Sequence, residues 1–203
     1  MEKCDQDTPE GWDLEYSGEP YQDRIKNDRE YWKKFLDECI DHSKPLRILE
    51  FGCGIGDYAN YLREKGHKVL GTDYSPKAIE IAKSRYPNTD YSIVDIRDFR
   101  GYNCYDIIIA FEVIEHLREP EKILYQIRKS LTPKGQFIFS LPHKEGKFGV
   151  MNQHLTLWDH NIIVKTFGRY FNQIKFNIVN HMSDGLNIFG SANRGDLIDK
   201  RKI

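Results

Sequence analysis

The chain has 203 residues, of which 39% are hydrophobic and 30% are charged, and its formal net charge at pH 7 is -1. This length and composition suit one globular domain with one core. Because acidic and basic residues nearly cancel, the composition does not favour a nucleic-acid partner, although a local basic patch stays compatible with it.

The sequence also indicates a compartment. No apolar run reaches the roughly 18 residues that a membrane-spanning helix needs, and the polar start from Met1 to Asp5 does not resemble a signal peptide. The four cysteines form no C-x-x-C pair, which argues against a thiolate zinc site and against a disulfide framework. We therefore expect a cytoplasmic protein without a membrane span.

The N-terminal region combines polar and large apolar residues. The first twenty residues are rich in Asp, Glu, Pro and Gly, yet they contain Trp12, Leu14 and Tyr16. This mixture predicts a loop or lid that docks on the domain. Residues 23–39 then place apolar side chains at helical spacing with charges between them, which predicts an amphipathic helix on one face of a sheet.

Two strand–helix units follow. The apolar stretch 47–51 predicts a strand that leads through three glycines into a helix over 58–65. A second strand is expected at 68–73, and Ser75-Pro76 supplies an N-cap and a first-turn proline for a helix through Ser84.

The second half of the chain continues the alternation and then changes it. Strands are expected at 91–94, 105–110 and 136–140, with a helix at 121–131. Asp159 is placed to cap a helix that ends at Tyr170. The β-like runs 174–179 and 186–190 are separated only by a turn, so they must be antiparallel.

These elements predict an α/β fold in one domain. Alternating strands and helices favour a doubly wound, mostly parallel sheet, here ending in an antiparallel C-terminal hairpin. Within the single domain we distinguish an N-terminal lid and helix (1–44), a cofactor-binding core (45–142), and an acceptor loop with helix and hairpin (143–203).

The glycine loop after the first strand predicts a nucleotide-like ligand. Glycines there let the backbone approach a ligand, and the next helix offers free N–H groups. Compared with the dinucleotide fingerprint G-x-G-x-x-G, the third glycine, Gly56, comes one residue early, and Asp57 takes the expected position. The pattern thus departs from that of NAD enzymes, although an oxidoreductase or a non-catalytic nucleotide-binding module stays an alternative.

Asp73 follows the second strand, 23 residues beyond Glu50. An ionised carboxylate at this place can accept hydrogen bonds from both ribose hydroxyls of an adenosine. Alternatively, Asp73 forms only an Asx turn before Ser75-Pro76.

These residues carry a family resemblance. The run Ile48-Leu49-Glu50-Phe51-Gly52-Cys53-Gly54-Ile55-Gly56 resembles motif I of the Rossmann-like methyltransferases, and Gly71-Thr72-Asp73-Tyr74-Ser75 resembles their second motif. The likeness extends from about Arg47 to Ser140. It implies S-adenosylmethionine as cofactor and a seven-stranded sheet with strand order 3-2-1-4-5-7-6.

The resemblance also implies roles in cofactor binding. Glu50 and the glycines would border the methionine part, Asp73 the ribose, and Asp95 the adenine amine, unless Asp95 is a turn or helix-cap residue. The residues just beyond the fourth strand would line the sulfonium end. The expected cofactor-binding residues are Glu50, Gly52, Cys53, Gly54, Gly56, Asp73, Tyr74, Asp95, Ile96 and Phe111.

Glu112, Glu115 and His116 stand at i, i+3 and i+4 after the fourth strand. On a helical turn this spacing brings the three side chains to one face. Two carboxylates and an imidazole suit Mg²⁺, Mn²⁺ or Zn²⁺, and such an ion can lower the pKa of an acceptor oxygen, which points to O-methylation. The same cluster can also act in acid/base chemistry, which makes His116 a candidate catalytic residue.

This E-x-x-E-H run resembles that of the ubiquinone-biosynthesis O-methyltransferases and of the small-RNA 3′-terminal 2′-O-methyltransferases. In the latter resemblance both Glu residues and the His are metal ligands, and His154 would be a fourth. Many relatives carry Glu-His without a metal. The alternative that Glu115 and His116 only cap or pack the following helix therefore stays open.

The remaining expectations concern the acceptor. His143 follows the fifth strand and is a candidate base, unless it is an exposed loop histidine. Trp12, Tyr16, Tyr21 and the loop 144–158 are expected to set acceptor identity, and their aromatics suggest a planar or partly apolar small molecule, although they can equally cover a sheet edge. An RNA methyltransferase is the runner-up, with a basic surface of Lys144, Lys147, Arg169 and Lys175. The sequence leaves the acceptor, its reacting atom and the oligomeric state open.

Overall fold

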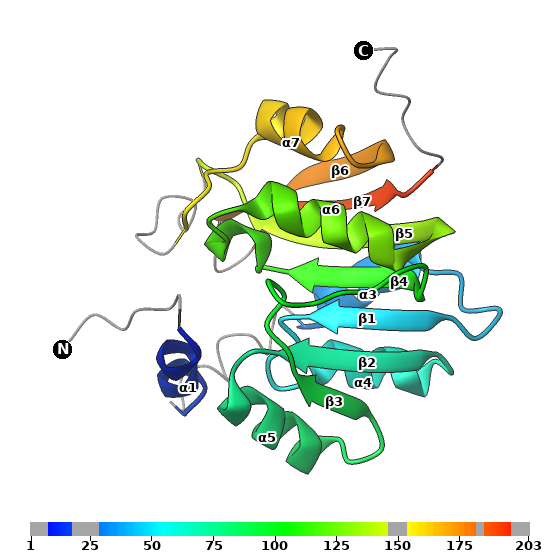
Figure 1. The fold of residues 1–203 in the computed structure, drawn as a ribbon, viewed down its shortest axis with the longest axis vertical. Coiled ribbons are helices and arrows are strands. Elements are labelled where there is room, and N and C mark those ends of the chain that lie inside the picture. Colours follow the sequence, from blue (N-terminus) through cyan, green and yellow to red (C-terminus); the bar gives the residue numbers. More distant parts are fainter. Residues whose placement is uncertain (1–7, 18–28, 146–153, 182–184, 196–203) are drawn as a thin grey trace. The chain divides into compact units, whose positions relative to one another are not determined.

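The structure is a computed structural model that describes residues 8–17, 29–145, 154–181 and 185–195. The chain divides into two compact units, Met1–Asp98 and Phe99–Ile203. Its strands form a seven-stranded sheet in the order β3-β2-β1-β4-β5-β7-β6 (Figure 1), which confirms the predicted order. Across the described part of the chain, no helix combines the length and the apolar character that crossing a membrane requires.

In its described residues, 8–17 and 29–98, the first unit has three parallel strands and four helices. Lys68 to Thr72 of β2 pair in register with Arg47 to Phe51 of β1, and β3 pairs with the other side of β2. The elements are α1 Pro9–Ser17, α3 Arg29–Cys39, β1 Arg47–Phe51, α4 Asp57–Glu64, β2 Lys68–Asp73, α5 Pro76–Arg85 and β3 Asp90–Ile93. Every strand and every later helix of this unit was predicted, with bounds that differ by one or two residues where the structure describes them.

The beginning of α5 follows the predicted capping. Ser75 is the N-cap, its Oγ accepts a hydrogen bond from the N–H of Ala78 at 3.0 Å, and Pro76 occupies the first helical turn. By contrast, α4 begins after Gly56, which has a positive φ and provides no side-chain cap. The first N–H groups of α4 therefore lie beside the glycine loop.

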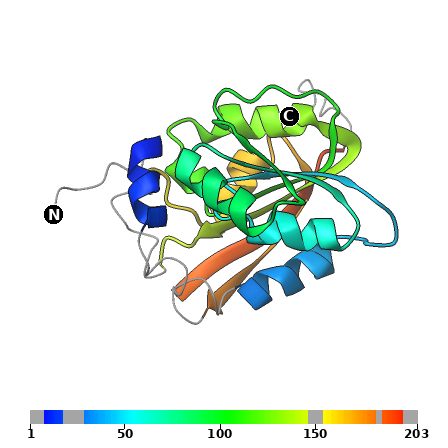
Figure 2. The same ribbon diagram turned by 90° about the horizontal axis from the view of Figure 1, so that it is seen from below.

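The expectation of a loop before residue 20 is wrong for residues 9–17, which form the helix α1. Its apolar residues lack a regular helical stripe, so periodicity alone does not reveal it. Instead, Trp12 and Tyr16, four residues apart on the helix, pack against the buried Ile55 and Ala78. Figures 1 and 2 show α1 beside the start of α5 from two directions. The predicted docking of the segment is thus confirmed, and the tertiary contact stabilises a helix that local sequence does not indicate.

The second unit carries the remaining four strands. β4 and β5 are parallel, β5 and β7 are antiparallel, and β7 and β6 form the predicted antiparallel hairpin. The elements are β4 Tyr105–Phe111, the 3-10 helix η1 Ile114–His116, α6 Pro120–Ser130, β5 Leu131–Pro142, α7 His160–Phe167, β6 Asn172–His181 and β7 Gly185–Asn193.

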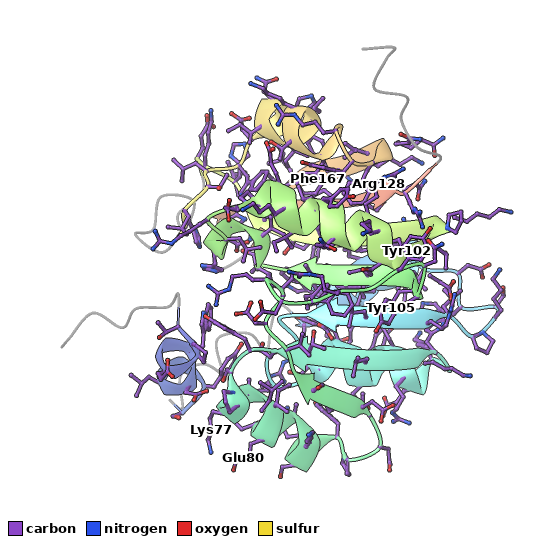
Figure 3. The ribbon with its side chains drawn as sticks, viewed as in Figure 1. Lys77, Glu80, Tyr102, Tyr105, Arg128 and Phe167 are labelled. Atoms are coloured by element: carbon purple, nitrogen blue, oxygen red, sulfur yellow. The ribbon has the colours of Figure 1, made fainter. Side chains whose placement is uncertain are left out.

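An aromatic core holds this unit together. Phe167 of α7 stacks on Phe137 with ring centroids 6.0 Å apart and contacts Trp158 edge-on at 5.7 Å. Both Phe167 and Trp158 are fully buried. On α6, the guanidinium of Arg128 donates to the backbone oxygen of Tyr170 at 2.8 Å, which ties the helix to the end of α7; Figure 3 labels Arg128 and Phe167.

Candidate functional site

The glycine loop of the first unit adopts a backbone that favours glycine. Gly52, Gly54 and Gly56 have φ values of 65°, 51° and 86°, all in the left-handed region. The loop is anchored to the next strand because the N–H of Cys53 donates to the backbone oxygen of Thr72 at 2.9 Å. Three left-handed glycines thus produce a turn whose inner face is free of side chains.

The early third glycine of the loop has a packing reason. Tyr91 of β3 lies under the loop, and its hydroxyl donates to the backbone oxygen of Gly56 at 2.8 Å. A Cβ at Gly56 would lie 2.4 Å from this hydroxyl, and a Cβ at Gly71 would lie 2.7 Å from the same ring. Gly56 therefore serves the packing of Tyr91 as well as the turn.

Gly56→Ala is expected to lower the free energy of unfolding by about 2–4 kcal/mol, because it adds a clash with Tyr91 to the strain of a left-handed non-glycine residue. Gly66→Ala is the matched control. Gly66 has a φ of 93° and nothing within 4 Å of its missing Cβ, so that variant measures the strain alone. Urea denaturation of both variants checks the prediction, and equal losses of stability would contradict the role of Tyr91.

Tyr16 of α1 covers the middle of the glycine loop. It is 7% exposed, and its hydroxyl lies 3.1 Å from the place where a Cβ of Gly54 would be. Its ring centroid is 5.9 Å from that of Trp12. The structure thus brings Trp12 and Tyr16 to the glycine loop. The third N-terminal aromatic, Tyr21, lies outside the described residues.

Asp73 is oriented by the glycine loop and by the start of α5. One carboxylate oxygen accepts from the N–H of Gly54 at 2.9 Å, and the other accepts from the N–H of Ser75 at 3.0 Å. Its side chain is buried, with 4% of the residue exposed. Each carboxylate oxygen has two acceptor sites, and the backbone N–H of Tyr74 is a third donor to this carboxylate. Both readings of Asp73 are compatible with its geometry, because these three bonds still leave acceptor capacity for a ribose hydroxyl.

Asp13 is a residue that sequence reasoning missed. Its Oδ1 accepts from the hydroxyl of Ser75 and, at 3.1 Å, from the N–H of Lys77. It thereby ties α1 to the start of α5, directly behind Asp73. The N-cap at Ser75 was visible in the sequence, but no local signal connects it with a carboxylate 62 residues earlier.

Glu50, at the end of β1, is buried with 2% of its surface exposed. Among the described residues its Oε2 has no hydrogen-bond partner. Burial, followed by the charge of Asp57, raises the pKa of Glu50 to about 8. A buried carboxyl oxygen without a partner fits a cationic group of a ligand, such as the ammonium of the methionine part of S-adenosylmethionine.

The affinity for S-adenosylmethionine is expected to fall as pH decreases below about 6. Burial raises the pKa of Asp73 to about 6, against the opposing effect of the N–H groups of Ser75 and Gly54. Since ribose hydroxyls donate to the ionised carboxylate, its protonation competes with binding, by up to about tenfold per pH unit. Calorimetric titration between pH 5 and 7.5 measures this, with Glu50→Gln expected to keep the step near 6. A flat profile would rule out Asp73 as the ribose acceptor.

The other predicted cofactor residues of the first unit are partly exposed. Asp95 accepts from the backbone N–H of Arg97 at 2.8 Å and forms an ion pair with its guanidinium. Despite partial burial, this contact lowers the pKa of Asp95. The guanidinium of Arg97 also lies 6.0 Å from the ring centroid of Tyr74. Asp95 thus makes the turn that was its alternative interpretation, and an adenine amine would share its carboxylate with Arg97.

In the second unit, the residues after β4 depart from the helical turn expected for E-x-x-E-H. Phe111 ends β4 and is buried, with 8% exposed. Glu112 has a φ of 52°, and only residues 114–116 form a short 3-10 helix. The helical i, i+3, i+4 interpretation of Glu112, Glu115 and His116 is therefore wrong, because the chain reverses at Glu112 before the turn begins.

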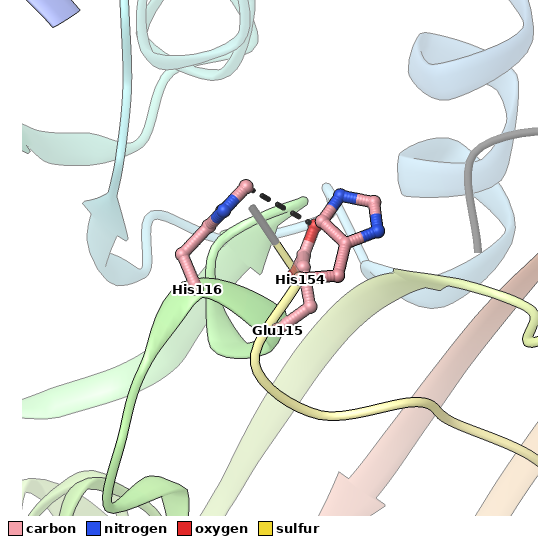
Figure 4. Close-up of side chains that lie close together, drawn as sticks. All are labelled: Glu115, His116 and His154. Atoms are coloured by element: carbon pink, nitrogen blue, oxygen red, sulfur yellow. Dashed lines mark ion pairs between the residues drawn. The ribbon is translucent and has the colours of Figure 1, made fainter. Parts of the chain in front are cut away.

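Three of the four predicted metal ligands nevertheless come together. Each of Glu115, His116 and His154 offers a ligand atom within 4.8 Å of the others. The Nε2 of His116 lies 3.7 Å from a carboxylate oxygen of Glu115, and the ring centroids of the two histidines are 5.1 Å apart (Figure 4). His154 is held there because the backbone N–H of Leu155 donates to the backbone oxygen of Glu115 at 2.8 Å.

Glu115 is the unusual member of this cluster. It is fully buried, and within the described part of the chain neither carboxylate oxygen has a hydrogen-bond partner. Burial, together with the negative charge of Glu112, raises the pKa of Glu115 well above its usual value. A buried carboxylate beside two imidazoles fits a divalent cation, because a cation would compensate the negative charge that Glu115 would otherwise bury.

His143 lies at the end of β5 and is 7% exposed, so it is not an exposed loop histidine. Its Nδ1 accepts from the N–H of Glu145 at 3.2 Å, and its backbone N–H donates to Leu186 at 3.0 Å.

The basic residues expected for RNA binding are partly neutralised. Lys144 pairs with Asp159 at 2.7 Å, and Arg169 pairs with Glu121 at 2.6 Å. Lys147 lies outside the described residues.

The strand order, the glycine loop with a buried acid after the second strand, and the buried Glu50 define a nucleoside-cofactor-binding protein of the Rossmann-like class. Residues 24–179 match the family model described as a methyltransferase domain, so the chain belongs to this methyltransferase family. The family's cofactor is S-adenosylmethionine, and the site residues of the first unit fit it.

The relatives agree with this assignment. A ubiquinone biosynthesis O-methyltransferase from Erwinia tasmaniensis is 27% identical over 149 residues, which cover 69% of this chain and 58% of the relative. An S-adenosylmethionine-dependent methyltransferase from Mycolicibacterium smegmatis is 29% identical over 48% of this chain and 38% of the relative. The matched part of this chain thus spans 58% of the length of the first of these curated relatives and 38% of the second.

Solved structures support the fold. The N-methyltransferase NodS from Bradyrhizobium japonicum, in complex with S-adenosylhomocysteine, superposes with a TM-score of 0.75 at 17% identity, covering 94% of this chain and 100% of that one. At this identity the likeness concerns the fold alone.

Proposed function

We propose that this chain transfers a methyl group from S-adenosylmethionine to an oxygen atom of a small molecule, assisted by a divalent metal ion. The observation that carries the proposal is the buried cluster of Glu115, His116 and His154, with the Glu115 carboxylate lacking a hydrogen-bond partner among the described residues. Relatives of this chain are named ubiquinone biosynthesis O-methyltransferases. This name supports oxygen as the methyl-accepting atom.

In the proposed reaction, the bond between the methyl carbon and the sulfonium sulfur breaks while a bond to the acceptor oxygen forms. S-adenosylhomocysteine leaves, and the acceptor oxygen loses its proton. Because the sulfonium is a good leaving group, the protein must mainly orient the two reactants and exclude water. Glu50, Gly52, Cys53, Gly54, Gly56, Asp73, Tyr74, Asp95, Ile96 and Phe111 are proposed to hold the cofactor.

The acceptor oxygen is activated by the cluster that follows β4. Glu112, Glu115, His116 and His154 are the proposed ligands of Mg²⁺, Mn²⁺ or Zn²⁺. Such an ion, when bound, supplies Lewis acidity that lowers the pKa of an acceptor hydroxyl.

The proton of the acceptor needs a receiving group. With no ion at the cluster, His116, which faces the carboxylate of Glu115 at 3.7 Å, is the better candidate, because a carboxylate stabilises an imidazolium. With an ion bound, the ring of His116 serves as a ligand and the proton passes to solvent water. The Nδ1 of His143 already accepts a backbone hydrogen bond, which favours a positioning role for His143 over that of a base.

Fractionation of a labelling reaction tests the acceptor class. The protein is incubated with methyl-labelled S-adenosylmethionine and a cell extract, and label is measured in small-molecule, RNA and protein fractions. Label in organic-soluble small molecules is the expected result. Label confined to RNA would instead favour an RNA methyltransferase, and charge-reversal variants of Arg169 and Lys175 would then test the basic surface.

A further inference from the structure

Ser140 is a fully buried hydroxyl in an otherwise apolar stretch of β5. Its neighbours Phe139 and Leu141 are buried as well. β5 is an interior strand at this point, because Ser140 pairs with Phe111 of β4 on one side and with Phe189 of β7 on the other. A hydroxyl buried among such side chains requires a hydrogen-bond partner.

That partner is Glu112. The hydroxyl of Ser140 donates to Oε1 of Glu112 at 2.6 Å and accepts from the N–H of Glu112 at 3.1 Å. The backbone oxygen of Ser140 accepts from the same N–H at 3.4 Å. Ser140 thus fixes both the backbone and the carboxylate of Glu112.

The fixed conformation is an uncommon one. Glu112 has a φ of 52°, in the left-handed region that non-glycine residues seldom occupy. Such a conformation persists only where surrounding contacts impose it, and it is frequent at functional sites. Glu112 stands two residues before η1, the short helix that carries Glu115 and His116. Its two hydrogen bonds with Ser140 therefore fix a carboxylate at the entry to the segment from which two of the cluster residues come.

We propose that Ser140 is a positioning residue, which holds the Glu112 carboxylate at the cluster of Glu115, His116 and His154 so that it can bind a divalent ion. The inference rests on the proposed function, because it assumes that this cluster takes a metal. It adds that the site depends on a side chain of β5, which belongs to none of the motifs that point to the cluster. Mutation of a residue that hydrogen-bonds to a metal ligand typically lowers metal affinity by about 10–100-fold.

Direct titration with Mn²⁺ alone tests the inference, with free Mn²⁺ followed by electron paramagnetic resonance. Ser140→Ala is expected to raise the dissociation constant by about tenfold or more. Ser140→Cys fills the same space with a weaker donor and is expected to have a smaller effect. Ser130→Ala is the matched control: Ser130 is also fully buried, but its hydroxyl donates to the backbone of Gln126 at 2.8 Å on α6. It should leave the affinity unchanged.

A double-mutant cycle separates positioning from general destabilisation. If Ser140 acts through Glu112, Ser140→Ala should cause no further loss of Mn²⁺ affinity in a Glu112→Gln background. Equal losses in both backgrounds would overturn the inference, as would wild-type affinity in both Ser140 variants. A wild-type protein that binds no Mn²⁺ would overturn the metal proposal and the inference together, whereas wild-type binding with unaffected Ser140 variants would overturn the inference alone.

Discussion

Asp73→Ala is expected to weaken S-adenosylmethionine binding by more than about tenfold, because it removes charge-assisted hydrogen bonds to the ribose. The loss has a second component. The same carboxylate accepts hydrogen bonds from the N–H groups of Gly54 and Ser75 at 2.9 and 3.0 Å. Its removal therefore also takes away a contact that orders the glycine loop. Isothermal titration calorimetry at pH 7.5 measures the dissociation constant.

Two further variants define what that loss means. Ser75→Ala weakens the cap of α5 and the contact with Asp13 but keeps the Asp73 carboxylate, so it should lower thermal stability more than cofactor affinity. Asp41→Ala, at an exposed carboxylate before β1 that accepts from the N–H of Ser43, should change neither strongly. An unchanged titration for Asp73→Ala would exclude the assigned cofactor site.

Glu115→Gln is expected to abolish Mn²⁺ binding in the accessible concentration range, because it removes the charged ligand at the centre of the cluster. Stability should change little. Burial and the charge of Glu112 raise the pKa of Glu115, and a glutamine has nearly the same size and shape as this buried side chain.

The matched control is Glu119→Gln, which makes the same change at an exposed residue next to α6. Glu119 pairs with Lys122 on the surface, and its loss should leave Mn²⁺ affinity as in the wild type. Retained Mn²⁺ binding by Glu115→Gln would show that the buried cluster is not a metal site, and Glu115 would then have the packing role that its sequence context also allowed.

The strand–helix units could be predicted because their information is local. A short apolar run, three glycines and a Ser-Pro pair fix β1, the loop and the start of α5 within a few residues of sequence. The helix α1 could not be predicted in this way, since Trp12 and Tyr16 find their apolar partners only at Ile55 and Ala78 in the folded chain.

In the candidate site, too, the residues that belong to a local motif could be predicted, and those that act through tertiary contacts could not. Asp73 and the glycines were recognised because their spacing belongs to a continuous motif. Glu115 and His116 were named from their residue types and spacing and His154 from a resemblance, and the structure brings the three together. The reversal at Glu112 was not predictable, because it depends on Ser140, a residue 28 positions later on β5. Tyr91 and Asp13 were missed for the same reason, as both act on motifs to which they do not belong.

The dependence of methyl transfer on a metal ion tests the central claim most directly. The wild-type protein is incubated with methyl-labelled S-adenosylmethionine and the small-molecule fraction of an extract, once with Mn²⁺ or Mg²⁺ and once with a chelator, beside Glu115→Gln. We predict transfer with the metal, its loss with the chelator, and no response to metal in the variant. Transfer that proceeds equally with chelator and in Glu115→Gln would contradict the metal-assisted mechanism.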